Sequence, residues 1–244
     1  MFTKIGVFDS GIGGVTVLKE CLKLCPYYEY VYYSDSKNNP YGDKDIEEVL
    51  NISSNICKYL INKGCKIIII ACNTASAMSV DYLREKFKDI TFIAIEPAIK
   101  VAYDKKELEG TLIMATKGTM DSERFNILYN KYHYDNFYLH PCIGLANIIE
   151  NDYEKLDYLE NNLNKYKNKI KSIVLGCTHY SLIKKELSNL LGNVTFYEGT
   201  VGVAKRLKKI IEENNIMESK NKITFIDSLN NKEKEKRFYN ILNS

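Results

Sequence analysis

Short runs of β-branched and other apolar residues alternate with longer stretches of helical character along the first third of this chain. This alternation constrains the fold more than any other feature of the sequence. The apolar runs and the helical stretches that follow them are Lys4 to Phe8 with Val15 to Leu24, Val31 to Tyr33 with Ile46 to Lys63, and Lys66 to Ala71 with Ala75 to Phe87. Such alternation is typical of a parallel sheet that helices cover on both faces. The sequence therefore predicts an α/β fold, with ligands bound at the strand-to-helix turns.

The same pattern returns later in the chain at a nearly constant offset. Asp9 and Thr116 follow two matching strands 107 residues apart, and Cys72 and Cys177 follow another matching pair 105 residues apart. A repeat of this kind predicts two similar α/β domains with parallel sheets, related by pseudo-two-fold symmetry. One cysteine of each domain would then face the active site in the inter-domain cleft. The matching strands are Ile5 to Phe8 with Thr111 to Ala115, and Ile67 to Ile70 with Ser172 to Leu175.

The domain limits follow from the repeat and from the end of the chain. Its 244 residues allow two modest domains, and we expect a boundary near Pro97. The first domain is predicted to span residues 1–97 plus 210–244, and the second residues 98–209. The tail from about Ile210, with a strand at Ile223 to Ile226 and a final helix, would return to the first domain. Residues 212–222 are rich in Lys, Glu and Asn, which indicates a solvated helix end and loop.

Composition excludes several functional classes. The net charge is +3, and basic residues are scattered among acidic ones, so nucleic-acid binding is unsupported. The longest apolar run, Ile67 to Cys72, is far shorter than the ~18 residues that a membrane helix needs. The chain has seven cysteines with no C-x-x-C pair, and its N-terminal residues do not form a signal peptide. We therefore expect a cytoplasmic protein with reduced cysteines.

Cys72 and Cys177 are the strongest candidates for catalysis. A cysteine at the start of a helix has its thiolate stabilised by the helix dipole, which can lower the thiol pKa from about 8.5 toward neutrality. A single buried cysteine is more often a small apolar core residue, but two at matching turns favour chemistry. Two thiols on opposite sides of one carbon suit inversion at that carbon, because one removes a proton while the other delivers one.

Polar residues at the same turns could assist these thiols. Asn73, Thr74 and Thr178 could stabilise the developing negative charge. Asp9 has two interpretations, an N-cap or a carboxylate that tunes Cys72 or holds a substrate ammonium group. His179 lies two residues after Cys177 and could exchange a proton with it.

The sequence gives no support for a cofactor. The segment DSGIGG is interpreted as a turn for a small anion, because Thr16 stands where a dinucleotide fingerprint needs its last glycine. The spacing of Cys and His residues does not indicate a metal site. Lys117 could in principle hold pyridoxal phosphate, but nothing else in the sequence favours such a site. We therefore expect neither a metal nor a cofactor.

Seven segments in order along the chain form a recognisable pattern: IGVFDSGIGGVTVLKE (5–20), YSDSKNNPYGDK (33–44), ACNTASA (71–77), IEPAIKVA (95–102), ATKGTMDS (115–122), PCIGLANIIE (141–150) and LGCTHYSLI (175–183). The Cys-Asn-Thr and Gly-Cys-Thr-His motifs are the most specific part of this pattern. Through these segments nearly the whole chain resembles the glutamate racemase family, whose members supply D-glutamate for bacterial peptidoglycan.

The resemblance implies a cofactor-independent racemase that acts on L- and D-glutamate in the cytoplasm. Cys72 would be the base that acts on D-glutamate and Cys177 the base that acts on L-glutamate. Asp9 and His179 would assist these two cysteines, and Glu150 would orient His179. Whether the protein forms a homodimer is left open by the sequence. The residues implied in substrate binding are Asp9, Ser10, Tyr41, Gly42, Asn73, Thr74, Thr119, Thr178 and His179.

The chain departs from the family pattern at Asn38, Ile143, Ser181 and Glu198-Gly199, and none of these departures removes a catalytic group. They leave open an aspartate racemase or a racemase of broader specificity, and hydantoin racemases are related alternatives. A ligand-binding homologue without turnover is a further alternative, which the retention of both cysteines disfavours.

Overall fold

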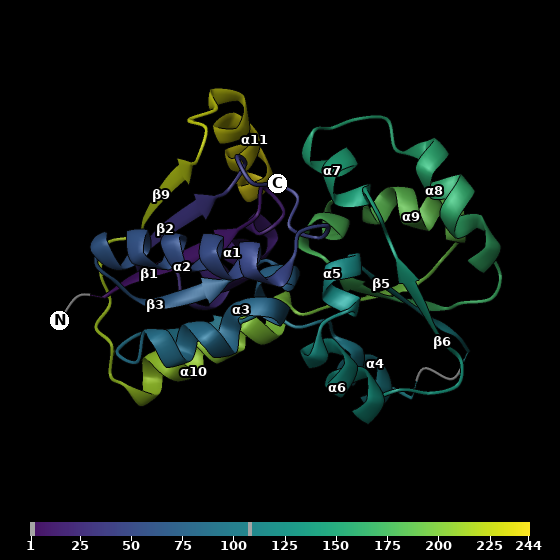
Figure 1. Cartoon of the computed structure of the whole chain (residues 1–244), viewed down its shortest axis with the longest axis horizontal. Helices are drawn as coiled ribbons and strands as arrows, with labels where there is room; N and C mark the ends of the chain where they lie inside the picture. Colours follow the sequence, from purple (N-terminus) through teal and green to yellow (C-terminus); the bar gives the residue numbers. More distant parts are fainter. Residues whose placement is uncertain (1–2, 107–108) are drawn as a thin grey trace.

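The computed structural model describes residues 3–106 and 109–244, which form two parallel sheets placed side by side (Figure 1). In the first sheet the strand order is β4-β3-β1-β2-β9, and in the second it is β6-β5-β7-β8. The strands of the first sheet are β1 (Lys4–Asp9), β2 (Glu29–Ser34), β3 (Cys65–Ile70), β4 (Thr91–Ala94) and β9 (Lys222–Asp227). Those of the second are β5 (Thr111–Ala115), β6 (Phe137–Pro141), β7 (Ser172–Gly176) and β8 (Thr195–Glu198).

Helices cover both faces of each sheet. Those around the first sheet are α1 (Val15–Leu24), α2 (Ile46–Asn62), α3 (Asn73–Lys86), α10 (Thr200–Glu213) and α11 (Lys232–Asn243). Those of the second half are α4 (Ile99–Asp104), α5 (Lys117–Met120), α6 (Glu123–Lys131), α7 (Leu145–Glu150), α8 (Leu156–Leu163) and α9 (Lys184–Leu191), with the 3₁₀ helices η1 (Asn164–Tyr166) and η2 (Thr178–Ile183).

The strand orders preserve the internal repeat. The order β4-β3-β1-β2 in the first sheet corresponds to β8-β7-β5-β6 in the second, and β9 is an additional edge strand beside β2. The predicted α/β fold with two parallel sheets is therefore confirmed. The domain limits at residues 97 and 210 stay a prediction. Residue 210 lies inside α10, which begins at Thr200 and packs against α1 in the core of the first half.

Alternating side chains of the inner strands supply both faces of each core. In β3, Ile67 and Ile69 pack with α1, α10 and α11, whereas Ile68 and Ile70 pack with α2 and α3 on the opposite face. A parallel strand that is buried on both faces needs apolar side chains at every position. This requirement explains the continuous isoleucine run that predicted the strand.

The carboxyl ends of the central strands bring the predicted turns together. Asp9 ends β1, Cys72 lies between β3 and α3, and Thr116 lies between β5 and α5. Cys177 follows β7, but the helix after it is the 3₁₀ helix η2 and not the expected α-helix.

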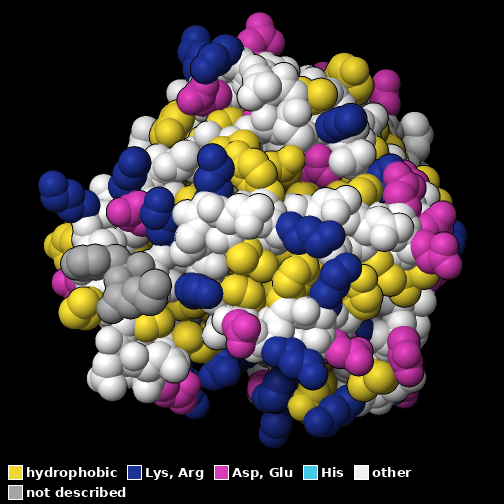
Figure 2. Space-filling view, turned by 60° about the vertical axis from the view of Figure 1, so that its left-hand side comes forward, with side chains coloured by type: hydrophobic (Ala, Val, Ile, Leu, Met, Phe, Trp, Pro, Cys, Tyr) yellow, Lys and Arg dark blue, Asp and Glu magenta, His cyan; other side chains and the backbone are white. Residues whose placement is uncertain are grey.

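On the face in Figure 2, basic and acidic side chains are interspersed with apolar ones. Within the described residues, no helix is long and apolar enough to cross a membrane. All seven cysteines lie in the described part of the chain and are free.

Candidate active site

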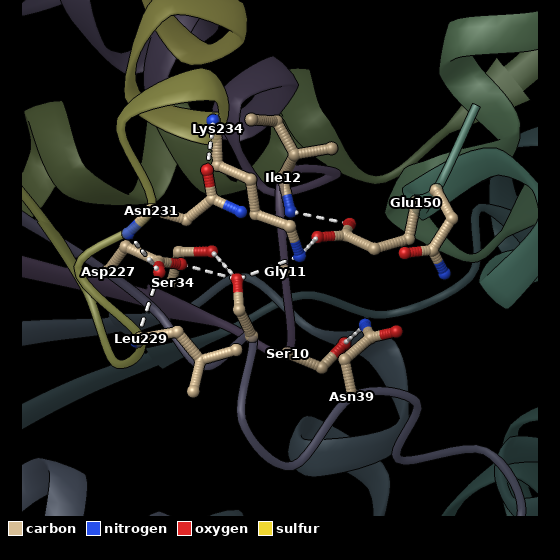
Figure 3. Close-up of polar contacts among 12 residues, drawn as sticks. Ser10, Gly11, Ile12, Ser34, Asn39, Glu150, Asp227, Leu229, Asn231 and Lys234 are labelled. Atoms are coloured by element: carbon tan, nitrogen blue, oxygen red, sulfur yellow. Dashed lines mark hydrogen bonds and ion pairs between the residues drawn. The ribbon is translucent and has the colours of Figure 1, made fainter.

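Cys72 lies at the N-cap of α3, where its side chain is buried beside the β1 turn. Its Sγ donates to Ser10 Oγ over 3.8 Å, and Asn39 Nδ2 donates to the same hydroxyl oxygen over 3.4 Å. The Asn39 side chain approaches Ser10 from the loop after β2 (Figure 3). The sequence-predicted residues Ser10 and Cys72 are therefore direct neighbours.

The predicted lowering of the cysteine pKa by a helix start does not hold for Cys72. Burial and the nearby Asp9 carboxylate raise the pKa of this thiol to about 12. The backbone N–H of Ala75, in the first turn of α3, acts in the expected direction but is outweighed. Cys177 also contributes to the raised pKa of Cys72, which places the two thiols within electrostatic reach of each other.

Cys177, His179 and Glu150 form a connected group. His179 Nδ1 lies 3.8 Å from Cys177 Sγ, and His179 Nε2 lies 2.7 Å from Glu150 Oε2. Burial disfavours a charged imidazole, but hydrogen bonds to Cys177 and Glu150 outweigh it and raise the pKa of His179 well above its usual range. His179 is therefore placed to exchange a proton with the Cys177 sulfur while Glu150 holds the opposite edge of the ring.

Glu150 is buried, and its carboxylate accepts from three separate segments of the chain. Besides His179, it accepts from the backbone N–H of Ile12 over 2.9 Å and from Lys234 Nζ over 2.6 Å (Figure 3). Burial raises the pKa of Glu150, but the bond and charge of His179, the charge of Lys234 and the Ile12 N–H together lower it to about 2. Glu150 is therefore an ionised partner for His179.

Asp9 is fully buried and does not cap a helix. Its Oδ1 accepts from the Gly11 N–H over 2.9 Å, and its Oδ2 accepts from the Thr178 hydroxyl over 3.0 Å. The N-cap of α1 is Gly14, so the N-cap interpretation of Asp9 is wrong. Burial raises the pKa of Asp9, although His179, Gly11 and Thr178 oppose that effect.

A threonine cluster also joins the two halves of the chain. Thr74 Oγ1 lies 2.9 Å from Thr116 Oγ1 and 3.3 Å from Thr119 Oγ1. Next to it, the Gly118 N–H donates to the Gly42 carbonyl oxygen over 2.9 Å. A Cβ atom added at Gly42 would lie 2.8 Å from the Thr116 side chain, so this close approach of the two halves requires glycine.

Asn73 differs from its neighbours because neither polar atom of its buried amide has a hydrogen-bond partner among the described residues. Buried amides are almost always paired in proteins, so both polar atoms of Asn73 are free to pair with a ligand. Tyr41 is also buried, and its hydroxyl donates to Asp35 Oδ2 over 2.6 Å. Tyr41 thus stays close to Cys72 and Asp9, whose charges contribute to its raised pKa, but its hydroxyl already has a partner.

Sequence reasoning missed Lys234 and Arg237 of α11. Arg237 donates to the carbonyl oxygens of Glu150 and Ile149 over 2.6 and 2.8 Å. Along the sequence, Lys234 lies 84 residues from Glu150 and Arg237 lies 87 residues from it. No local motif marks a contact over such a separation.

Two departures from the family pattern contact each other. Ser181 Oγ donates to Glu198 Oε2 over 2.6 Å, and Lys184 Nζ lies 2.7 Å from the other oxygen of Glu198. Asn38 donates to both carboxylate oxygens of Asp35. Ile143 is exposed.

The described part of the chain shows no site for pyridoxal phosphate at Lys117 and none for a metal ion. The Lys117 side chain is more than half exposed and pairs with Asp121 at the surface. No group of three or more His, Cys, Asp or Glu side chains in residues 3–106 and 109–244 is arranged to hold a metal ion.

Comparisons with known proteins agree with this geometry. Residues 6–207 match the model of the Asp/Glu/hydantoin racemase family. A glutamate racemase of Clostridium acetobutylicum is 41% identical over 92% of this chain and 91% of its own length. One from Clostridium perfringens is 42% identical over 95% of this chain and 92% of its own.

Comparison with solved structures identifies the same group of proteins. The crystal structure of the Francisella tularensis glutamate racemase in complex with D-glutamate superposes with a TM-score of 0.82 at 27% identity, over 99% of this chain and 94% of that one. The Escherichia coli glutamate racemase, in complex with L-glutamate and the activator UDP-MurNAc-ala, gives a TM-score of 0.85 at 25% identity, over 100% and 95%. The chain therefore belongs to the Asp/Glu/hydantoin racemase family.

Proposed function

We propose that this protein interconverts L- and D-glutamate by two-base proton transfer between Cys72 and Cys177. One observation carries the proposal: the two thiols follow equivalent strands of an internal repeat, and each has its own proton-handling partner. Asp9 accompanies Cys72, and the His179–Glu150 pair accompanies Cys177. The glutamate racemases that match 92% and 95% of the chain support glutamate as the substrate.

The reaction can be written with its protons balanced. The Cys177 thiolate removes the α-proton of L-glutamate, which leaves an enolate-like carbanion, and the Cys72 thiol delivers its own proton to the opposite face. The products are D-glutamate, a Cys177 thiol and a Cys72 thiolate, and the reverse reaction restores the starting state. Burial and Asp9 raise the pKa of Cys72 to about 12, which suits a thiol that waits as the proton donor in this direction.

The weak acidity of the α-carbon must be overcome by fixed donors around the carbanion. The unpaired amide of Asn73 is the best placed of them, because Thr74 and Thr178 already bond to Thr116 and Asp9. An amide offers both a donor and an acceptor, which matches the carboxylate and ammonium groups of an amino acid. The remaining contacts would come from Ser10, Tyr41, Gly42 and Thr119.

D-Glutamate is a component of bacterial peptidoglycan, and we propose that the product enters that synthesis. The proposal needs no cofactor, since both protons are carried by side chains of the chain itself.

The test is proton exchange with solvent. Purified protein is incubated with L-glutamate and, separately, with L-aspartate in D₂O, while optical rotation and α-deuterium incorporation are followed. We expect loss of rotation and deuterium incorporation with glutamate. No exchange with either substrate in a folded sample would refute the racemase proposal. Exchange with aspartate alone would show that aspartate, and not glutamate, is the substrate.

Replacement of either thiol tests the two-base step. Cys177→Ala is expected to abolish racemisation while D-glutamate still binds, because binding rests on the turns and not on the sulfur. Cys142→Ala is the matched control, since Cys142 is equally buried but follows β6. Full turnover in Cys177→Ala would show that the wrong cysteine had been chosen.

A further inference from the structure

The C-terminal segment β9–α11 lies outside the internal repeat, yet it contacts the candidate active site. β9 is the additional edge strand of the first sheet, and the segment also lies beyond residues 6–207, which match the family model. α11 stands across from α7, whose last residue is Glu150 (Figure 1). The contact between them is made by Lys234 and Arg237.

Lys234 neutralises the carboxylate of Glu150 directly. Its Nζ lies 2.6 Å from Glu150 Oε1 and also donates to Ser36 Oγ over 2.9 Å. The side chains of Glu150 and Lys234 are 1% and 17% exposed, so solvent screens this ion pair only weakly. Glu150 uses its other oxygen, Oε2, for His179 and Ile12.

The start of α11 is fixed by hydrogen bonds that determine where Lys234 lies. Asn231 Oδ1 caps the helix and accepts from the N–H groups of Glu233 and Lys234 over 2.9 and 3.3 Å. Asp227, the last residue of β9, accepts from the N–H groups of Leu229 and Asn231 over 3.0 and 3.1 Å (Figure 3). The position of Lys234 is therefore fixed by a hydrogen-bonded turn and a capped helix start.

Arg237 holds the same glutamate by its backbone. It lies one turn after Lys234 and donates to the carbonyl oxygens of Glu150 and Ile149 at the end of α7. The last carbonyl groups of a helix have no partner inside the helix, so these bonds fix the end of α7. α11 thus sets both the charge and the position of Glu150.

We propose that Lys234 is a positioning residue for the proton transfer at Cys177. This inference rests on the proposed function. Lys234 does not touch the reacting atoms, but it acts through Glu150, which holds His179 against Cys177. At the other thiol no lysine or arginine is paired with Asp9, which among the described residues accepts from the neutral donors Gly11 and Thr178. The segment outside the repeat therefore makes the two proton transfers unequal.

The charged and titratable groups that face Glu150 determine the pH effect. They are His179 of η2, Lys234 and Arg237 of α11, Asp9 of β1 and Tyr32 of β2. Removal of Lys234 takes away one of the charges that lower the pKa of Glu150, so this pKa must rise. Glu150 is then protonated at a higher pH, and His179 loses its anionic partner there. We expect the acid limb of the kcat/KM profile to move to higher pH.

The test compares Lys234→Met with Lys236→Met, an equal loss of charge on an exposed position of the same helix. Lys234→Met is expected to lower kcat by about 10- to 100-fold, the scale of a misplaced catalytic group, and to shift the acid limb. Lys234→Arg keeps the charge, so its kcat and the position of its acid limb should be close to those of the unmodified protein. Lys236→Met should match the unmodified protein. Coincident acid limbs in Lys234→Met and Lys236→Met would overturn the proposal, whatever the loss in kcat.

Isotope effects identify the step that is slowed. The two enantiomers have equal free energy, so kcat/KM must fall equally in both directions and cannot reveal the cysteine involved. With α-deuterated substrates, a slower transfer at Cys177 should increase the isotope effect on L-glutamate and decrease that on D-glutamate. Equal changes in both directions would overturn the assignment of Lys234 to Cys177.

A measurement without turnover separates this inference from the proposed function. In protein labelled with ¹³C at the glutamate carboxyl carbons, the Glu150 signal is assigned from a Glu150→Gln sample. Its titration midpoint should be higher in Lys234→Met than in Lys236→Met. An unchanged midpoint refutes the role of Lys234 even if glutamate is racemised, and a shift supports it even if another amino acid is the substrate.

Discussion

Thr178 donates its hydroxyl proton to Asp9 over 3.0 Å and so joins the two candidate proton-transfer sites. Thr178 follows Cys177 in the second half of the chain, whereas Asp9 ends the first strand and raises the pKa of Cys72. The residue next to one thiol is therefore bonded to the carboxylate beside the other. The same bond is a direct contact between the two halves of the chain.

The first prediction concerns that bond. Thr178→Val keeps the shape of the side chain but leaves a buried oxygen of Asp9 without a donor, which costs about 1 to 3 kcal/mol of unfolding free energy. Racemisation should fall by about 10-fold or more, because Asp9 is no longer held in place. Urea unfolding and a polarimetric assay measure the two effects. Thr178→Ser retains the hydroxyl and is the control; if it behaved like Thr178→Val, the hydroxyl bond would not be the cause.

Asp9 should limit stability at neutral pH. Its pKa in the folded protein is raised by burial, so ionisation is easier in the unfolded chain. The free energy of unfolding therefore decreases as pH rises from the ordinary aspartate pKa through the raised pKa of Asp9 in the folded protein. Asp9→Asn removes this loss, and we expect its melting temperature to exceed that of the unmodified protein at pH 7, with the gap closing in acid. Racemisation should be largely lost. A gap that is independent of pH would contradict this account.

Close packing of the two halves explains a third prediction. A Cβ atom at Gly13 would lie 2.6 Å from Thr178 Oγ1 and 2.7 Å from the backbone nitrogen of His179. Gly13→Ala must therefore push the second half away from the first, and racemisation should fall by about 100-fold. Circular dichroism should show that the fold is kept.

Gly202 in α10 is the matched control for this substitution. A Cβ atom added there meets no atom within 4 Å, and an alanine inside a helix is favoured over glycine. Gly202→Ala should raise the unfolding free energy by about 0.4 to 1 kcal/mol without a change in turnover. Equal losses of turnover in the two variants would refute the role of close packing at Gly13.

Much of the fold was predictable because its signals are local. The isoleucine run of β3, the helical stretch that became α1 and the nearly equal offsets between turns all lie in short segments or in their repetition. They predicted two parallel sheets and placed the two cysteines at equivalent strand ends. The return of residues 223–226 to the first sheet was also predicted, as β9 pairs with β2.

What could not be predicted depends on contacts between distant segments. The cations of α11 meet Glu150 only because the folded chain brings their side chains to the end of α7. The pKa of Cys72 depends on how deeply the folded chain buries it, so a rule based on the helix start alone gave the wrong direction. The sequence left two interpretations of Asp9 open, and the N-cap interpretation could be excluded only when the start of α1 was known.

The last prediction separates stability from function at Asn73. Its buried amide has no partner among the described residues, a state that costs about 1 to 3 kcal/mol in a folded protein. Asn73→Leu should therefore raise the unfolding free energy, while KM for glutamate rises because the ligand loses its donor and acceptor. Ser54→Ala also removes a buried unpaired atom, in α2, and should stabilise the protein with unchanged KM. If Asn73→Leu destabilised the protein and left KM unchanged, the amide would be a structural group and not a substrate contact.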